Sequence, residues 1–390
     1  MKKHIVVLLV LLFALLVCGE QLFAIPAFAR KYSMSCSTCH NPFPRLKAYG
    51  DEFAENGFVL KDKDAPRYTQ KTGDDKLSLI RDFPIALRLE GHMVYNQANR
   101  EKVDFATPYL AKLLTGGSLA KNLSYYLYFY MSERGEVAGI EDAFLMFNNV
   151  FGTGISVTVG QFQVSDPLFK RELRLTYEDY EIYRLSPGAS SINLAYDRGI
   201  MLGYDFEKGP GIVLEILNGN GLPEADGFRT FDSDKYKNLM ARVSQDFGDA
   251  FRIGAFGYLG KEAPNGTVNE VWIAGADATL AFGENLELNV QVVARHDDNP
   301  FFRAVASEVD TLGGFAELIF LPYGDGSPWY VVGLVNLIDS EQNNLDYQSA
   351  GGHIGIMLRR NIRMVAEATY IFKGPFGKHL RAGIGFISAF

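Results

Sequence analysis

The chain has 390 residues, enough for one large domain or two ordinary ones, and a formal net charge of -8 with an isoelectric point near 5.4. This acidic balance argues against nucleic-acid binding, which needs a basic surface. Beyond the first 24 residues no apolar run is long enough for a membrane-spanning helix, and 20 Tyr, 29 Phe and 39 Gly suit many twisted strands better than a helical core.

Residues 1–24 have the parts of a secretory signal. Two lysines precede the apolar run 5–17, and the small residue Ala24 ends the segment. We therefore expect cleavage after Ala24 and export from the cytoplasm. Cys18 leaves a lipoprotein signal open as an alternative, although the residue before it fits that pattern poorly.

Cys36, Cys39 and His40 form the most informative motif of the chain. Two cysteines three apart, with a histidine directly after the second, are the pattern of c-type haem attachment. Each thiol adds to one vinyl group of the haem, and the imidazole of His40 becomes the proximal iron ligand. A thioredoxin-like redox pair or half of a zinc site are the alternatives, but neither a βαβ pattern nor a second Cys/His pair accompanies the motif. The sequence predicts one covalent haem c.

Residues 25–60 hold this motif and one predicted helix, which we expect to begin at Pro44 and to stop at Gly57. Its apolar stripe suits either a haem face or an ordinary core. Residues 61–82 are charged and punctuated by Pro and Gly, so they read as a linker. About fifty residues with a single helix bury too little surface to enclose a haem unaided, so another part of the chain must complete the pocket.

Residues 83–390 change to a period of two, in about sixteen segments of roughly ten residues. In the first segment, Arg88, Glu90 and His92 alternate with apolar neighbours. A soluble sandwich also alternates, but it rarely has so many long strands. The sequence therefore predicts an all-β transmembrane barrel of about sixteen antiparallel strands, porin-like and placed in the outer membrane. The small N-terminal helical segment is expected to plug or cap its lumen.

The predicted links between strands alternate in length, as short periplasmic turns and longer outer loops do. The expected short turns are Gly116-Gly117, 208–211, 247–250, 283–285, 324–327 and 359–361. The expected outer loops include 97–107, 165–191, 219–235 and 297–309. The longest loop contains a helix-like, charged run and resembles the loop that folds into the pore of sixteen-stranded porins. A solvated surface helix is the alternative.

The N-terminal part of the chain resembles a known family. The residues that carry the resemblance are Ile25-Pro26-Ala27-Phe28-Ala29-Arg30, Cys36-Ser37-Thr38-Cys39-His40, Pro44-Arg45-Leu46, Gly50, Phe53 and Gly57-Phe58. They are similar to the N-terminal cytochrome of the fused outer-membrane monohaem cytochrome c–porins, a family that includes proteins regarded as extracellular Fe(II) oxidases. The resemblance implies one haem c at the periplasmic end or in the lumen of the barrel. It also implies electron transfer to or from a periplasmic c-type cytochrome or other carrier, with an extracellular partner such as Fe(II).

The distal haem ligand is less clear from the sequence. No Met or His lies between His40 and His92, and strand parity points His92 into the lumen but Met93 toward lipid. His92 is therefore the first candidate, followed by His353 and the α-amine of Ile25. The alternative for His92 is a lumen histidine that is bonded to neighbouring charges.

Two further groups of residues bear on electron transfer. Tyr126, Tyr128 and Tyr130 share one inward face and suit either an electron relay or a structural role. Acidic pairs in the outer loops suit either Fe²⁺ binding or solvated surface charge: Asp297 with Asp298, Glu178 with Asp179, and Asp232 with Asp234.

The sequence contains no nucleophile–base pair and no phosphate loop, so no catalytic residue is predicted. We expect an outer-membrane electron-transfer protein. An extracellular Fe(II) oxidase and a diffusion porin with a haem-bearing plug are the alternatives.

Overall fold

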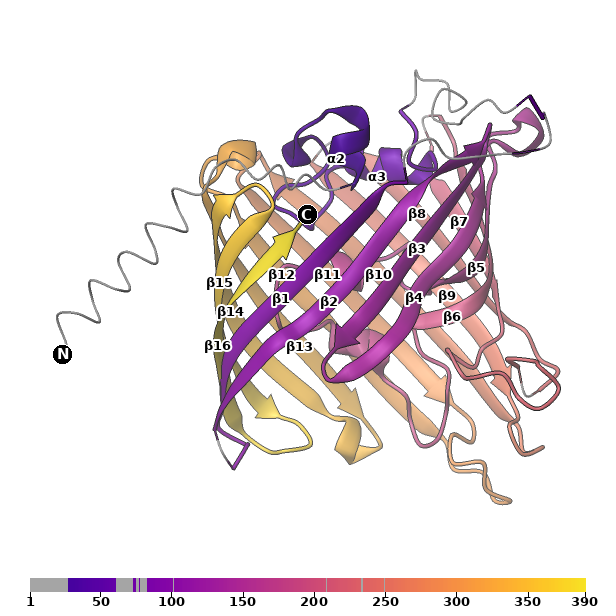
Figure 1. Ribbon diagram of the computed structural model, residues 1–390. Coiled ribbons are helices and arrows are strands. Elements are labelled where there is room, and N and C mark those ends of the chain that lie inside the picture. Colours follow the sequence, from indigo (N-terminus) through magenta and orange to yellow (C-terminus); the bar gives the residue numbers. More distant parts are fainter. Residues whose placement is uncertain are drawn as a thin grey trace.

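A computed structural model describes residues 27–60, 73, 74, 77 and 83–390, except 101, 208, 233 and 249. The predicted signal 1–24, the amine of Ile25 and most of the predicted linker lie outside these residues. Within them, sixteen antiparallel strands pair in sequence order and close into one barrel by pairing of the first with the last (Figure 1). The strands are β1 (Ile85–Asn96), β2 (Val103–Ala120), β3 (Leu123–Glu133), β4 (Glu136–Phe147), β5 (Ser156–Gln163), β6 (Tyr196–Asp205), β7 (Gly211–Leu217), β8 (Asn238–Phe247), β9 (Phe251–Glu262), β10 (Asn269–Phe282), β11 (Leu286–Asp297), β12 (Val309–Phe320), β13 (Trp329–Ser340), β14 (Tyr347–Arg359), β15 (Ile362–Lys373) and β16 (His379–Ala389). The predicted sixteen-stranded antiparallel barrel is confirmed.

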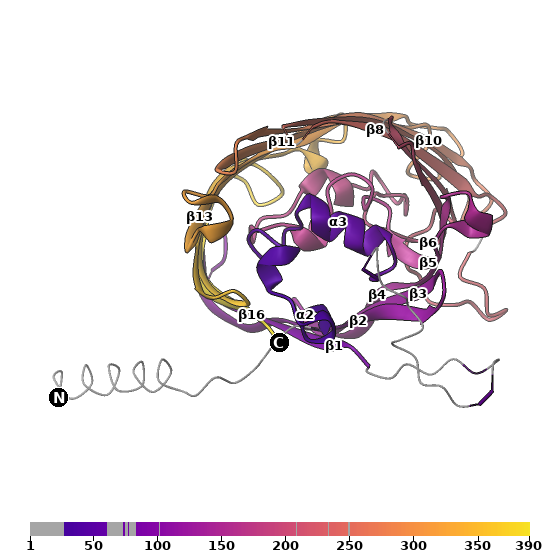
Figure 2. The same ribbon diagram turned by 90° about the horizontal axis from the view of Figure 1, so that it is seen from above.

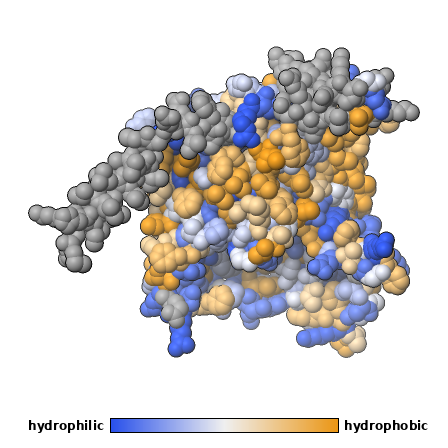
Figure 3. All heavy atoms as spheres, viewed as in Figure 1, coloured by the Kyte–Doolittle hydropathy of each residue, from blue (hydrophilic) through white to orange (hydrophobic). Residues whose placement is uncertain are grey.

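Side chains alternate between the lumen and the outside along the wall. On β1, His92 is buried on the lumen side while its neighbour Met93 is 42% exposed on the outer face, as parity predicts. Hydrophobic residues gather over the outer wall in Figure 3. Aromatic pairs mark both rims of this wall, with Phe320 and Trp329 at one end and Tyr370 and Phe372 at the other. An apolar band between aromatic girdles is typical of a lipid-facing barrel.

The two ends of the barrel differ. One end carries short turns such as 283–285 and 360–361, and the other carries the longer links 164–195, 218–237 and 298–308. The start of β1 and the C-terminus lie together at the short-turn end, where Leu87 and Phe390 exchange two backbone hydrogen bonds of 2.6 and 2.9 Å. The predicted asymmetry of turns and loops is therefore confirmed.

One predicted turn was wrong. Gly116 and Gly117 lie inside β2, opposite Tyr126 and Tyr125 of β3, and the chain reverses only after Ala120. A Cβ on Gly116 would stand 3.4 Å from the ring of Phe28, which belongs to the N-terminal segment. These glycines therefore allow the N-terminal segment to pack closely against β2, and they do not form a turn.

Residues 27–60, called the cap below, lie at the short-turn end (Figures 1 and 2). The cap contains α2 (Ala27–Tyr32), the 3₁₀ turn η1 (Cys36–Thr38) and α3 (Ala48–Glu55). In Figure 2 its helices lie within the outline of the barrel. Its longer helix begins at Ala48, and not at Pro44 as predicted, because the backbone just before it folds back on the turn that contains Cys39. No helix in the described residues is both long and apolar enough to cross a membrane.

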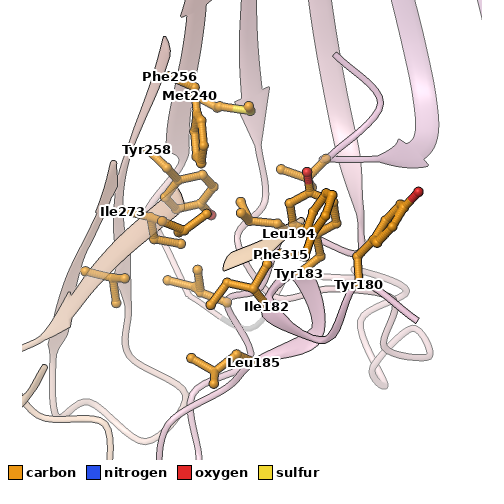
Figure 4. Packing of buried hydrophobic residues seen from close by; sticks show 14 of the residues in the cluster. Tyr180, Ile182, Tyr183, Leu185, Leu194, Met240, Phe256, Tyr258, Ile273 and Phe315 are labelled. Atoms are coloured by element: carbon orange, nitrogen blue, oxygen red, sulfur yellow. The ribbon is translucent and has the colours of Figure 1, made fainter. Parts of the chain in front are cut away.

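Residues 164–195, called the inner loop below, fold into the lumen. They form the short 3₁₀ turns η4 (Arg171–Leu173) and η5 (Glu181–Arg184) but no α-helix, so the surface-helix alternative is wrong. Figure 4 shows Tyr180, Ile182 and Tyr183 of this loop packed against wall residues, including Phe315. The rings of Tyr180 and Phe315 stack at 4.1 Å. The largest buried apolar cluster therefore joins the inner loop to the wall.

Candidate functional site

The cap brings Cys36, Cys39 and His40 together on one tight turn. The amides of Cys39 and His40 both donate to the carbonyl of Cys36, at 3.2 and 2.9 Å. Both cysteines are free thiols, and burial raises the pKa of each. Both are therefore protonated near neutral pH. The three residues that the sequence predicted as one site lie at one place.

His40 is held in a defined orientation. Its Nδ1 lies 2.8 Å from the carbonyl oxygen of Pro44. A carbonyl oxygen only accepts, so Nδ1 carries the proton and Nε2 keeps its lone pair. Burial lowers the pKa of His40 to about 4, so the ring is neutral at physiological pH. A neutral imidazole whose second nitrogen donates to a carbonyl is the arrangement that metal-ligating histidines have.

The chain folds back on the motif directly after it. The amide of Lys47 donates to the carbonyl of Cys39 at 2.8 Å, and Leu46 forms an isolated β-bridge with His40. A Cβ on Gly50 would overlap the carbonyl oxygen of Cys39. Only glycine therefore lets α3 lie this close to the turn with Cys36, Cys39 and His40.

The other side of the cap is aromatic. Phe28 and Phe58 stack at 5.0 Å, and Phe53 meets Phe28 edge-on at 5.4 Å. Phe58 also stacks on Tyr126 of β3 at 5.2 Å, which joins the cap to the wall. Two free thiols, an oriented neutral imidazole and an apolar cluster within the same cap are a set of residues that fits a covalent haem c.

Polar contacts fix the cap on the rim of the barrel. Asp325, in the turn between β12 and β13, accepts two hydrogen bonds from the cap. Asn41 Nδ2 lies 2.6 Å from its Oδ1, and Lys47 Nζ lies 2.6 Å from its Oδ2. Arg45 forms an ion pair with Glu287 of β11. The cap is therefore bonded across the short-turn end of the barrel, at the position that the sequence predicted for a plug or cap.

His92 faces the lumen, as predicted, but its contacts are with the wall and the inner loop. Its ring meets those of Tyr109 and Tyr177 edge-on, with centroid distances of 5.3 and 5.0 Å, and its Nε2 is 3.7 Å from Glu90. It is seven residues along β1 from Ile85, or about 23 Å at a rise of ~3.3 Å per residue. The carbonyl of Ile85 accepts from Arg30 of the cap.

His353 is the second lumen histidine. Its Nδ1 lies 3.0 Å from Glu367 and its Nε2 lies 3.3 Å from the hydroxyl of Tyr330. The ring contacts of His92 are with the wall and the inner loop, and the hydrogen bonds of His353 are with the wall. Distal ligation of a haem by His92 stays a prediction.

The three tyrosines of β3 have different surroundings. Tyr126 contacts the cap, and its ring centroid lies 6.4 Å from that of Tyr128. Tyr128 is buried, with the ammonium of Lys112 5.0 Å from its ring centroid. Tyr130 lies near the loop end, 3.4 Å from Glu136. The inward face predicted for these tyrosines leads from the cap toward the centre of the lumen.

The acidic pairs do not form open sites for Fe²⁺. Glu178 is 1% exposed and is paired with Arg381, and Asp297 accepts from Arg295 at 2.7 Å. The third pair accepts hydrogen bonds from nearby amides and a lysine. Among the described residues, no group of three or more His, Cys, Asp or Glu is arranged to hold a metal ion. The structure gives the outer-loop iron site no support.

The sequence reasoning missed a charge cluster in the lumen. Lys112 of β2 is fully buried, with its Nζ 2.5 Å from Glu141, 3.1 Å from Glu133 and 3.1 Å from Glu172 of the inner loop. The only sequence signal was a lysine in a strand otherwise poor in charge. Its partners lie on three other segments, β3, β4 and the inner loop, so they became visible only with the strand pairing.

The fold and the lumen together define the class: the chain is a porin-like, sixteen-stranded barrel. No protein-family model matches the sequence, and no curated protein sequence matches it. Solved porins do match the structure. An anion-selective porin from Comamonas acidovorans superposes with a TM-score of 0.60 and 11% identity, over 79% of this chain and 99% of the porin.

Two other solved channels are similar to the same extent. The outer membrane channel DcaP of Acinetobacter baumannii gives a TM-score of 0.56 at 13% identity, over 79% of this chain and 97% of its own. OmpF of Salmonella typhi, solved with daunomycin, gives 0.54 at 12% identity, with the same two coverages. At these identities the likeness shows the fold of the barrel.

Proposed function

We propose that this chain is an outer-membrane electron-transfer protein that carries one haem c in its cap. The observation that carries the proposal is the single turn with Cys36, Cys39 and His40, in which the carbonyl of Pro44 orients the imidazole. Cys36 and Cys39 would hold the haem covalently, and Nε2 of His40 would ligate the iron. When bound, the haem supplies reversible one-electron chemistry. The resemblance to the fused cytochrome–porins supports the same assignment.

The barrel would place this haem at a membrane boundary. The apolar outer wall, its aromatic rims and the likeness to outer-membrane porins support insertion in the outer membrane. In such barrels the short turns face the periplasm, so the cap would meet a periplasmic c-type cytochrome or another carrier. An extracellular donor or acceptor, Fe(II) among them, would exchange electrons from the loop end.

A diffusion porin with a haem-bearing plug is the second candidate, and the likeness to solved porins favours it. The inner loop and the cap both occupy the path between the two ends, which favours the electron conduit. Liposome swelling with small sugars separates the two. Swelling as fast as with an open porin would support diffusion, and no swelling would support the conduit.

Covalent haem is tested first. The full-length protein, produced with a c-type maturation system, is separated under denaturing conditions and stained for haem. We expect haem to migrate with the wild-type chain and with Ser37→Ala, which changes the same turn but no attachment residue. Cys36→Ala/Cys39→Ala should carry none. A wild-type chain without covalent haem would refute the proposal.

Electron transfer is tested next in proteoliposomes that contain oxidised cytochrome c and are exposed to Fe(II) outside. The wild-type protein should reduce the enclosed cytochrome, and the double cysteine variant should not. Equal rates for the two would exclude the haem as the carrier. The Soret band of His92→Ala tests the distal ligand, because an unchanged spectrum removes His92 from the iron.

A further inference from the structure

The lumen contains a cavity between the inner loop and the wall of β1, β15 and β16. Its volume is about 40 Å³, more than the ~10–15 Å³ that one water needs. Arg88, His92, Arg174, Arg363 and Arg381 line it together with glutamates. The cavity is therefore large enough for a small ion and is surrounded by charged groups.

Arg363 is the unusual member of this lining. The residue is 3% exposed, and its Nη1 donates to the hydroxyl of Tyr330. Its Nε and Nη2 are buried and have no hydrogen-bond partner. In the described residues no carboxylate oxygen lies within 4.0 Å of its guanidinium. Arginine stays charged in proteins, so Arg363 is a buried cation with two donors on one free edge.

The acidic groups of the cavity are already engaged elsewhere. Glu90 accepts from Nε of Arg88 at 2.7 Å, and Glu133 and Glu172 are each paired with Lys112 at 3.1 Å. Glu367 accepts from His353, and from two backbone amides of the inner loop at 2.6 and 2.8 Å.

The remaining cations of the cavity are engaged in the same way. Arg381 is paired with Glu178, and Nη1 of Arg174 donates to the carbonyl of Arg171 at 2.8 Å, while its buried Nε lies 3.7 Å from Asp179 without a hydrogen bond. Among the four arginines of the lining, Arg363 is therefore the one that has no carboxylate oxygen of the described residues within 4.0 Å.

A second unpartnered donor faces the same cavity. His92 is 6% exposed, and its Nε2 has no hydrogen-bond partner, the carboxylate of Glu90 lying 3.7 Å away. Strand pairing places His92 and Arg363 at nearby levels of the wall. Gly385 of β16 pairs with His92 of β1 on one side and with Val365 of β15, two residues from Arg363, on the other. A Cβ on Gly385 would overlap the imidazole, so the missing side chain leaves room for the ring.

We propose that this cavity binds a small oxyanion, of the carboxylate or phosphate type. Nε and Nη2 of Arg363 form the parallel pair of donors that binds two oxygens of such a group, and Nε2 of His92 adds a third donor. The bound anion neutralises the buried guanidinium. The site uses barrel residues alone, so it does not depend on haem attachment, and it assigns His92 to the anion rather than to the iron.

The test is titration calorimetry of the purified full-length protein in detergent, at constant ionic strength, with inorganic phosphate, acetate and chloride as separate probes. We expect saturable binding of phosphate or acetate, and the tighter of the two identifies the class. Arg363→Lys keeps the charge but loses the paired donors, so oxyanion affinity should fall about tenfold or more while chloride affinity changes less. Arg363→Gln should abolish binding, and His92→Ala should weaken it.

Arg252→Lys is the matched control, because the same edge of Arg252 is already occupied by Asp246, at 2.5 and 3.1 Å. It should bind like the wild type. Far-UV circular dichroism checks that each variant folds, and Arg363→Lys decides the result if Arg363→Gln does not. Absence of saturable oxyanion binding to the wild type, or equal affinity in Arg363→Lys, would overturn the proposal.

Discussion

The cap and the inner loop both occupy the barrel, but they are held in opposite ways. The inner loop is joined to the wall by buried polar contacts, such as Glu172 with Lys112 and Tyr183 with Gln291 at 2.6 Å. The cap is joined to the rim by exposed polar pairs at Asp325, by the half-buried ion pair of Arg45 with Glu287 and by one aromatic stack. Removing one member of a buried ion pair leaves the other charge buried without a partner, which strongly destabilises the fold. An exposed ion pair contributes little to stability. We therefore expect the inner loop to unfold together with the wall, and the cap to be a separately attached unit.

The largest effect should come from the buried lysine between loop and wall. Lys112→Met leaves Glu133, Glu141 and Glu172 close together without their cation. Breaking such a buried ionic group costs about 3–5 kcal/mol. Denaturant unfolding in detergent, followed by circular dichroism, measures the loss. Lys121→Met, at an exposed turn, is the control and should change stability by less than ~0.5 kcal/mol. Equal losses in the two variants would show that the loop is not fixed through Lys112.

A change inside the cap should affect the cap alone. Gly50→Ala forces a methyl group against the carbonyl of Cys39, and such overpacking costs about 1–3 kcal/mol. We expect less covalent haem per chain, measured by absorbance, and an unchanged unfolding midpoint of the barrel. Gly352→Ala is the matched control, because no atom lies within 4 Å of the added Cβ. A barrel midpoint that falls with Gly50→Ala would contradict the separation of the two units.

The cap motif and the barrel wall are the two features that local sequence patterns predict. The haem hypothesis needs only Cys36, Cys39 and His40, because the attachment chemistry depends on local spacing, and it stays a prediction. The wall could be predicted because period two places His92 inward and Met93 outward whatever the strand partner. Both signals are contained within a few consecutive residues.

The errors concern contacts between distant segments. Gly116 and Gly117 have the composition of a turn, yet their role depends on Phe28 of the cap lying against them. The three partners of Lys112 and the free edge of Arg363 depend on strand pairing and on the course of the inner loop. A single sequence contains these residues but not their distances, so the oxyanion site could not be predicted from it.

The smallest effect should come from the rim. Asp325→Ala removes the acceptor of both Asn41 and Lys47, and exposed pairs of this kind contribute about 1 kcal/mol or less. The barrel should keep its unfolding midpoint, while the cap should become more accessible to trypsin at Arg45 and Lys47. Asp339→Ala is the control, since that exposed carboxylate lies at the opposite end and 4.0 Å from Lys373. Because the aromatic stack of Phe58 on Tyr126 remains, we expect faster cleavage of the cap but not its loss. Cleavage at the wild-type rate would mean that the stack, and not Asp325, fixes the cap to the barrel.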